Sequence, residues 1–110
     1  MYNRILKAAA KPLETPEVTE ILEKQLAGWC LRSHNDVPAI ETSIKLKDFE
    51  TTSSFINQVN LRSHLLGHHP TIQYTYNNVK IILQTHDANA VTDVDITMAK
   101  KINSYIKRYQ

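Results

Sequence analysis

The residues best suited to proton-transfer chemistry lie in one stretch of the chain. His68 and His69 stand directly before Pro70, and His86 follows Thr85. Imidazole is the one side chain whose ordinary pKa lies near neutrality, so histidines gathered in one pocket can both donate and accept protons. The stretch therefore predicts an acid–base site built from His68, His69 and His86.

The expected position of these histidines in the fold suggests a division of labour. His68 and His69 come where a predicted helix should end, and the carbonyl end of a helix favours positive charge. One of this pair is therefore expected to serve as the acid. His86, expected beyond the last strand, would then be the neutral base.

A metal site is the alternative use of clustered histidines. His64 and His68 are four residues apart, which on a helix lets two imidazoles share an ion. Adjacent His68 and His69 give awkward ligand geometry, and Cys30, the single cysteine, is distant in sequence. We expect no metal here.

Composition limits the function further. A chain of 110 residues with 42% hydrophobic content fits one compact domain, which we place at residues 14–110. A formal charge of +2 with dispersed basic residues argues against a direct nucleic-acid partner. No apolar run is long enough to span a membrane. One cysteine permits no internal disulfide, which favours a reducing compartment.

Residues 1–13 form a basic segment with no acidic residue before Glu14. Arg4, Lys7 and Lys11 are interleaved with apolar residues, as in a mitochondrial targeting segment. A basic N-terminal arm is the alternative. The expected location is accordingly mitochondrial or cytoplasmic.

The hydrophobic pattern predicts helix, hairpin, helix, hairpin, helix. Helices are expected from an N-cap at Thr15 to Gly28, from Asp48 to Gly67, and from Thr92 to Tyr109. A short apolar stretch at residues 29–32 and an alternating stretch at 40–46 form the first hairpin. Residues 72–76 and 79–83 form the second, with Asn77-Asn78 as its turn. This order predicts an α+β fold: a four-stranded antiparallel sheet with three helices packed on one face.

The middle helix carries apolar residues on two faces. Phe49, Ile56 and Val59 share one face, with Ser63 and Leu66 beyond them, while Phe55 and Leu65 lie on the other. We expect the first face to meet the sheet. The second would then meet a loop or another subunit.

The spacing of the candidate residues resembles that of the pterin-4a-carbinolamine dehydratase family, also described as dimerisation cofactors of a homeodomain transcription factor. Its pattern runs from a polar residue through His-His-Pro, an aromatic residue and a further histidine to an aspartate. Every interval of that pattern is met here by His64, His68-His69-Pro70, Tyr76, His86 and Asp95.

The resemblance implies an enzyme, 4a-hydroxytetrahydropterin dehydratase, that needs no cofactor and assembles as a homodimer or homotetramer. Loss of water would give the quinonoid dihydropterin. By similarity, His68 and His86 are the acid and base in either order. His69 positions the substrate, and His64, Tyr76 and Asp95 complete the binding site.

Several of these residues also have plainer explanations, and two departures from the family pattern stand out. Thr92 with Asp95 is a helix-opening capping box by itself, and Tyr76 could be a cross-strand packing residue. His64 replaces the usual glutamate, which puts in doubt how His68 is held in its protonated form. Asn89-Ala90 replaces a glycine-containing turn.

Two other functions fit the same resemblance. The chain could be a non-catalytic dimerisation module or coactivator, with Phe55 and Leu65 on its partner-binding face. A pterin protein related to the molybdenum cofactor is the second possibility. A binding module would tolerate His68→Ala and His86→Ala, whereas an enzyme would lose turnover.

Overall fold

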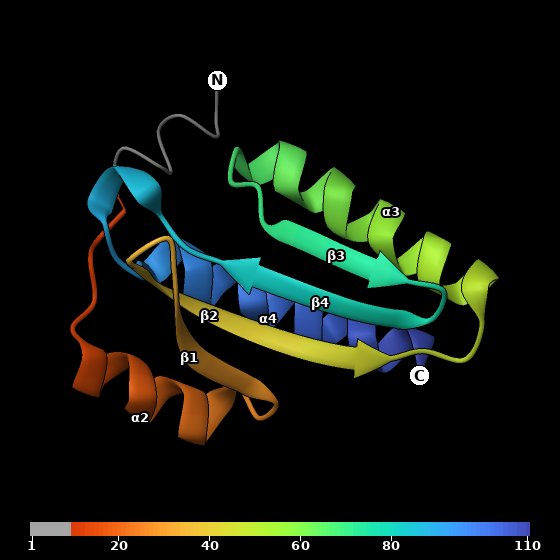
Figure 1. Cartoon of the computed structure of the whole chain (residues 1–110), viewed down its shortest axis with the longest axis horizontal. Coiled ribbons are helices and arrows are strands. Elements are labelled where there is room, and N and C mark those ends of the chain that lie inside the picture. The colour runs from red at the N-terminus through yellow and green to blue at the C-terminus, as the bar shows by residue number, and fades with distance from the viewer. Residues whose placement is uncertain (1–9) are drawn as a thin grey trace.

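The computed structural model describes residues 10–110, and Figure 1 shows their arrangement. Residues 1–9, which hold most of the predicted targeting segment, lie outside the described residues. The elements in chain order are α2 (Thr15–Gln25), β1 (Trp29–His34), β2 (Val37–Lys45), α3 (Phe49–Leu66), β3 (Thr71–Thr75), β4 (Asn78–Leu83), the short 3₁₀ turn η1 (His86–Ala88) and α4 (Asp93–Tyr109).

The strands form one antiparallel sheet in the order β1-β2-β4-β3. Asn35 and Asp36 close the β1–β2 hairpin with φ of 54° and 64°. A tight type I′ turn requires such positive φ at both central residues, and Asn and Asp tolerate it best after Gly. The predicted first hairpin is therefore confirmed, with longer strands than expected.

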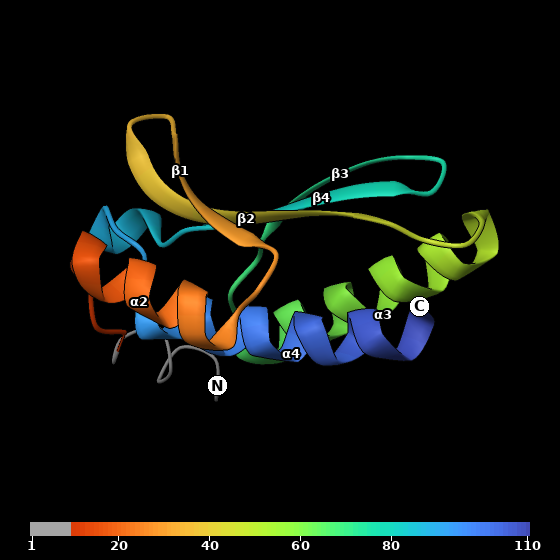
Figure 2. The same ribbon diagram turned by 90° about the horizontal axis from the view of Figure 1, so that it is seen from below.

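Helices α2, α3 and α4, the three α-helices within residues 10–110, cover the same face of the sheet, as Figure 2 shows. The core between the two layers contains fully buried residues from each: Ile40, Ile81 and Leu83 from the sheet, Val59 from α3, and Met98 and Ile102 from α4. The predicted α+β architecture is confirmed.

Helix α2 differs from the prediction at both ends. Thr15 is its first residue and Glu14 the N-cap, with no side-chain cap bond. The helix ends at Gln25, before Gly28, whose φ of 93° turns the chain into β1. The predicted N-cap at Thr15 is therefore wrong by one residue. Pro16 occupies the second helical position, where its missing N–H still costs no hydrogen bond because the first N–H groups of a helix have no partner within it.

Helix α3 buries Val59 and Ser63 as predicted, but its two phenylalanines lie opposite to the prediction. Phe55 is fully buried, whereas Phe49 is 48% exposed. The buried face also includes Thr52 and Ser63, whose hydroxyls donate to the backbone oxygens of Asp48 (2.8 Å) and Val59 (2.7 Å). Internally bonded hydroxyls can be buried at little cost. The predicted sheet-facing positions are therefore right for Val59 and Ser63 and wrong for Phe49, while Phe55 is buried with them.

The burial of Phe55 corrects the predicted partner-binding face. Phe55 packs edge-on against Tyr109 with ring centroids 6.2 Å apart, and so it cannot meet a partner. Leu65, at 48% exposure, does face outward, together with Leu61 at 67%.

The second hairpin turns one residue earlier than predicted. Thr75 pairs with Asn78, so the turn residues are Tyr76 and Asn77. Tyr76 adopts a φ of 53°, which is unusual for a bulky residue, and its ring stacks on Phe49 at a centroid distance of 6.4 Å. Tyr76 thus belongs to the turn and does not extend the strand.

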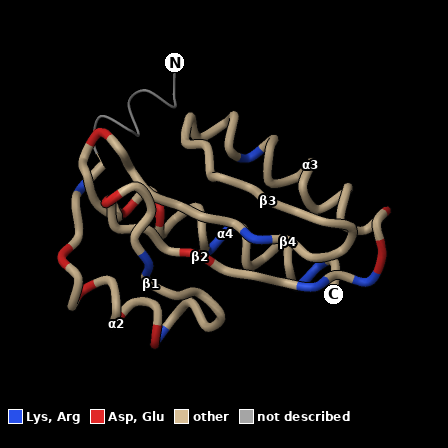
Figure 3. Tube along the Cα trace, in the orientation of Figure 1, with Lys and Arg blue, Asp and Glu red and all other residues tan. Residues whose placement is uncertain are grey.

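Charged residues are spread along the described trace, and Figure 3 shows the basic ones distributed over several elements. None of the helices described here is long and apolar enough to span a bilayer.

Candidate active site

The end of α3 fixes where His68 enters the site. Gly67 adopts the left-handed conformation, with φ of 66°. Its N–H donates to the oxygen of His64 (3.2 Å), and the N–H of His68 donates to that of Ser63 (3.1 Å). These two bonds form a Schellman motif, which closes the helix and turns the chain sharply. Because His68 lies beyond this turn, it no longer shares a helical face with His64.

The segment after β4 places His86 on a tight loop. The N–H of Thr85 donates to the oxygen of Ala90 (3.0 Å), and the N–H of Ala90 donates back to Thr85 (3.3 Å). Asn89 takes a φ of 54° inside this loop. Asn reaches the left-handed region more readily than most residues, so it replaces the family's glycine without opening the loop.

The first turn of α4 supplies the carboxylate of the site. Asp95 is fully buried, and it forms the predicted capping box with Thr92. The Thr92 N–H donates to Asp95 Oδ2 at 2.9 Å. The hydroxyl of Thr85 donates to the same oxygen at 2.9 Å. Oδ2 therefore holds the loop and the helix together.

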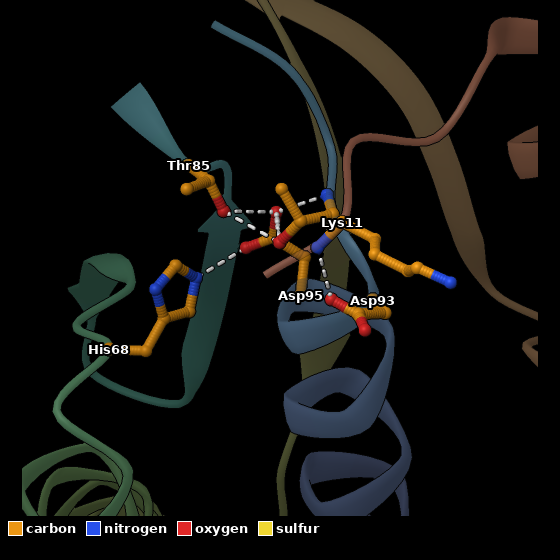
Figure 4. A network of polar contacts seen from close by, with 6 residues as sticks. Lys11, His68, Thr85, Asp93 and Asp95 are labelled. Atoms are coloured by element: carbon orange, nitrogen blue, oxygen red, sulfur yellow. Dashed lines mark hydrogen bonds and ion pairs between the residues drawn. The ribbon is translucent and has the colours of Figure 1, made fainter. Parts of the chain in front are cut away.

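The other oxygen of Asp95 binds His68, as Figure 4 shows. His68 Nε2 contacts Oδ1, and both side chains are almost completely buried, at 4% and 0% exposure. The carboxylate accepts from every partner, so Nε2 must carry a hydrogen. His68 Nδ1 is then the nitrogen that can exchange a proton with a ligand.

A small cavity of about 140 Å³ opens beside this pair. His68 and His69 line it from one side and Gln84, Thr85, His86 and Asp87 from the other. The volume is below the roughly 300 Å³ of a typical enclosed ligand pocket. The cavity can thus receive the reacting part of a ring, with the remainder outside. A larger hollow of about 420 Å³, lined by Lys45 and Lys80 among others, contains no histidine.

The structure brings together only part of the predicted site. His68, His69 and His86 line one cavity, and Asp95 lies behind His68. His64 is exposed on the last turn of α3 and does not line the cavity. Tyr76 lies in the β3–β4 turn and does not line it either.

Thr85 and Gln84 are site residues that the spacing did not indicate. Thr85 is buried and shares a 2.9 Å hydrogen bond with the hydroxyl of Thr92, in addition to its bond to Asp95. The Gln84 amide nitrogen donates to the oxygens of His34 (3.3 Å) and Val37 (3.2 Å), and so fixes this wall of the cavity to the β1–β2 turn. The only sequence signal was their position beside His86.

Within residues 10–110, no group of three or more His, Cys, Asp or Glu side chains is placed to hold a metal ion. The turn at Gly67 removes the helical spacing on which a shared His64–His68 site would depend. The donor set of the cavity instead suits proton transfer, since imidazoles and a buried carboxylate meet there.

The fold and the cavity define a class: a small α+β domain whose histidines converge beside a buried aspartate. The family model for pterin 4 alpha carbinolamine dehydratase matches residues 11–105. The chain belongs to this family.

Relatives agree over most of the chain. A Saccharomyces cerevisiae protein, whose name provisionally assigns it as a pterin-4-alpha-carbinolamine dehydratase, is 37% identical over 96% of this chain and 96% of its own length. A crystal structure titled as a transcriptional coactivator/pterin dehydratase from Brucella melitensis is 39% identical and superposes with a TM-score of 0.77, covering 86% of this chain and 98% of the other.

A more distant structure shares the fold alone. It is titled as a pterin dehydratase-like protein that is a RuBisCO assembly factor in the alpha-carboxysome. Its identity is 16% and its TM-score 0.62, with 72% of this chain and 89% of the other covered. The same fold therefore also occurs in a protein described as an assembly factor.

Proposed function

We propose that the protein is a dehydratase that removes water from a 4a-hydroxytetrahydropterin to give the quinonoid dihydropterin. The observation that carries this proposal is the convergence of His68, His69 and His86 on one cavity. Membership of the family supports the pterin as substrate.

The reaction requires one proton to be added and one to be removed. Protonation of the hydroxyl at C4a lets the C4a–O bond break and water leave. Loss of the proton from N5 then forms the C4a–N5 double bond, so atoms and charges balance. No redox step occurs, and the histidines can supply both transfers.

His68 is the proposed acid and His86 the proposed base. The Asp95 carboxylate holds the Nε2 hydrogen of His68 and is the counter-ion of its imidazolium form. A proton on Nδ1 can then be given to the leaving hydroxyl. His86 is exposed on its loop, so a proton that it takes from N5 can pass directly to water. His69 is the proposed positioning residue.

The test is direct assay of dehydration with purified protein and four histidine variants. We expect His68→Ala and His86→Ala to lower kcat by about 10²- to 10⁴-fold, the usual contribution of a general acid or base. His69→Ala should mainly raise KM. His34→Ala is the matched control, because His34 also contacts a carboxylate, Glu41 at 2.8 Å, but does not line the cavity.

Wild-type protein without turnover would refute the enzyme proposal. Equal activity in the His68→Ala variant would refute the mechanism alone. If the wild-type protein has no turnover, a non-catalytic role becomes the better account, and the outward Leu61 and Leu65 of α3 are the residues through which we would expect a partner, or a second copy of this chain, to bind.

A further inference from the structure

A short N-terminal segment, Lys11–Leu13, lies against the approach to α4. We call it the strap. The N–H of Leu13 donates to the oxygen of Val91 at 2.9 Å, and the N–H of Asp93 donates to the oxygen of Lys11 at 3.2 Å. Pro12 sits opposite Thr92 between these bonds. Its missing N–H costs nothing there, because the flanking residues make the hydrogen bonds.

A side chain adds a third bond to the strap. The backbone N–H of Lys11 donates to Asp93 Oδ1 at 2.9 Å, as Figure 4 shows. Asp93 thus holds the strap, while Asp95, two residues later on the same turn of α4, holds His68. The two carboxylates have separate partners on one helix end.

Thr92 joins the strap to the site. It lies opposite Pro12, and its N–H and hydroxyl contact Asp95 Oδ2 at 2.9 Å and 3.4 Å. Because the residues on both sides of Thr92 are bonded to the strap, the strap restricts where the N-cap of α4 can lie. Catalytic groups need placement to within about 0.5 Å, and an error of about 1 Å can lower a rate by roughly 10²-fold.

We propose that the strap is a positioning element of the active site, which acts on His68 through Thr92 and Asp95. This inference rests on the proposed function of the same site. The N-terminal segment would then contribute to turnover although none of its residues lines the cavity.

The test compares the full chain with two perturbed forms and two controls. One form lacks residues 1–13, and the other is Asp93→Ala, which removes the acceptor for Lys11. Asp93→Asn keeps a side-chain oxygen at that position. Lys11→Ala keeps all the strap bonds, because those of Lys11 use backbone atoms.

We expect both perturbed forms to lose about 10- to 100-fold in kcat, with KM changed less than twofold, while both controls stay near wild type. A second readout does not depend on turnover. The buried Nε2 hydrogen of His68 should give a low-field proton NMR resonance, which should broaden or exchange faster when the strap is lost.

A folded strap-deleted chain with wild-type kcat and an unchanged His68 resonance would overturn the proposal. A lower melting temperature without either change would show a merely structural role and would also overturn it. If the deletion does not fold, Asp93→Ala decides. If wild-type protein has no dehydratase activity, the proposed function fails, and the resonance still tests whether the strap positions His68.

Discussion

Replacing Asp95 by asparagine should separate catalysis from folding. The amide oxygen can take the place of Oδ2 and accept from Thr92 and Thr85, while the amide nitrogen takes the place of Oδ1. That nitrogen is a donor, so His68 must present Nε2 as an acceptor and carry its hydrogen on Nδ1. The hydrogen-bond network stays complete with the wrong tautomer of His68.

The expected fall in turnover follows from this change in the tautomer of His68. A wrong-tautomer substitution in the histidine–aspartate pair of serine proteases lowers turnover by about 10⁴-fold, and we expect a fall of about 10²- to 10⁴-fold here. Stability should fall by only about 1–2 kcal/mol, the difference between a charge-assisted and a neutral hydrogen bond.

Asp95→Ala is the contrasting variant. It removes the carboxylate that accepts from the N–H of the N-cap residue Thr92, which costs about 1 kcal/mol. It also leaves the Thr85 hydroxyl and the His68 ring without their acceptor, at about 1–3 kcal/mol for each buried group. The total of roughly 3 kcal/mol or more should lower Tm by over about 10 °C in a domain of this size.

The assays are steady-state kinetics at pH 7 and thermal unfolding followed by the fluorescence of Trp29, the single tryptophan. Trp29 is 5% exposed, and its Nε1 donates to Asn103 at 2.8 Å, so its emission should change on unfolding. An Asp95→Asn protein with wild-type kcat would refute the tautomer argument. Equal destabilisation by Asn and Ala would refute the account of the network.

Three further predictions concern the elements around the site. Gly67→Ala should lower the free energy of unfolding by about 1–2 kcal/mol in chemical denaturation, because the φ of 66° disfavours any residue with a Cβ; no loss would contradict the strain argument. Phe55→Ala should cost about 3–5 kcal/mol in the same measurement, since the ring is fully buried against Tyr109; a loss under 1 kcal/mol would place the ring outside the core. Hydrogen bonds from the backbone and side chain of Thr51 hold the pKa of Asp48 below its usual 3.8, so its contribution to stability should be present above pH 4 and disappear as the pH falls through the lowered pKa. Asp48→Asn should flatten this part of the stability–pH curve, and a curve identical to wild type would rule the contribution out.

The fold was predictable from the sequence because its signals were local. Alternation in residues 40–46, the glycine at position 67 and the Thr92–Asp95 spacing each specify a strand, a helix end or a helix start without tertiary information. The burial of Phe55 and the exposure of Phe49 on α3 were not predictable in this way. Thr52 is buried because its hydroxyl donates to the backbone oxygen of Asp48, and a pattern of apolar residues does not show this.

The candidate site was only partly predictable for a related reason. The spacing pattern identified the three histidines that line the cavity, but it could not distinguish a ligand-facing residue from one placed elsewhere. Tyr76 matches the pattern and lies at the turn of the second hairpin. Thr85 stood out only as the neighbour of His86, since its importance comes from a bond to Asp95 that exists only after β4 and α4 meet.

Asp95 gives one oxygen to the opening turn of α4 and the other to an imidazole, so melting that single turn would disconnect the imidazole from its carboxylate. Helix ends fray at a far smaller energetic cost than whole domains unfold. On warming, turnover should therefore be lost at a lower temperature than that at which the fluorescence of Trp29 changes, so that activity disappears while the core is still native. Cooling should restore the rate without any refolding of the domain.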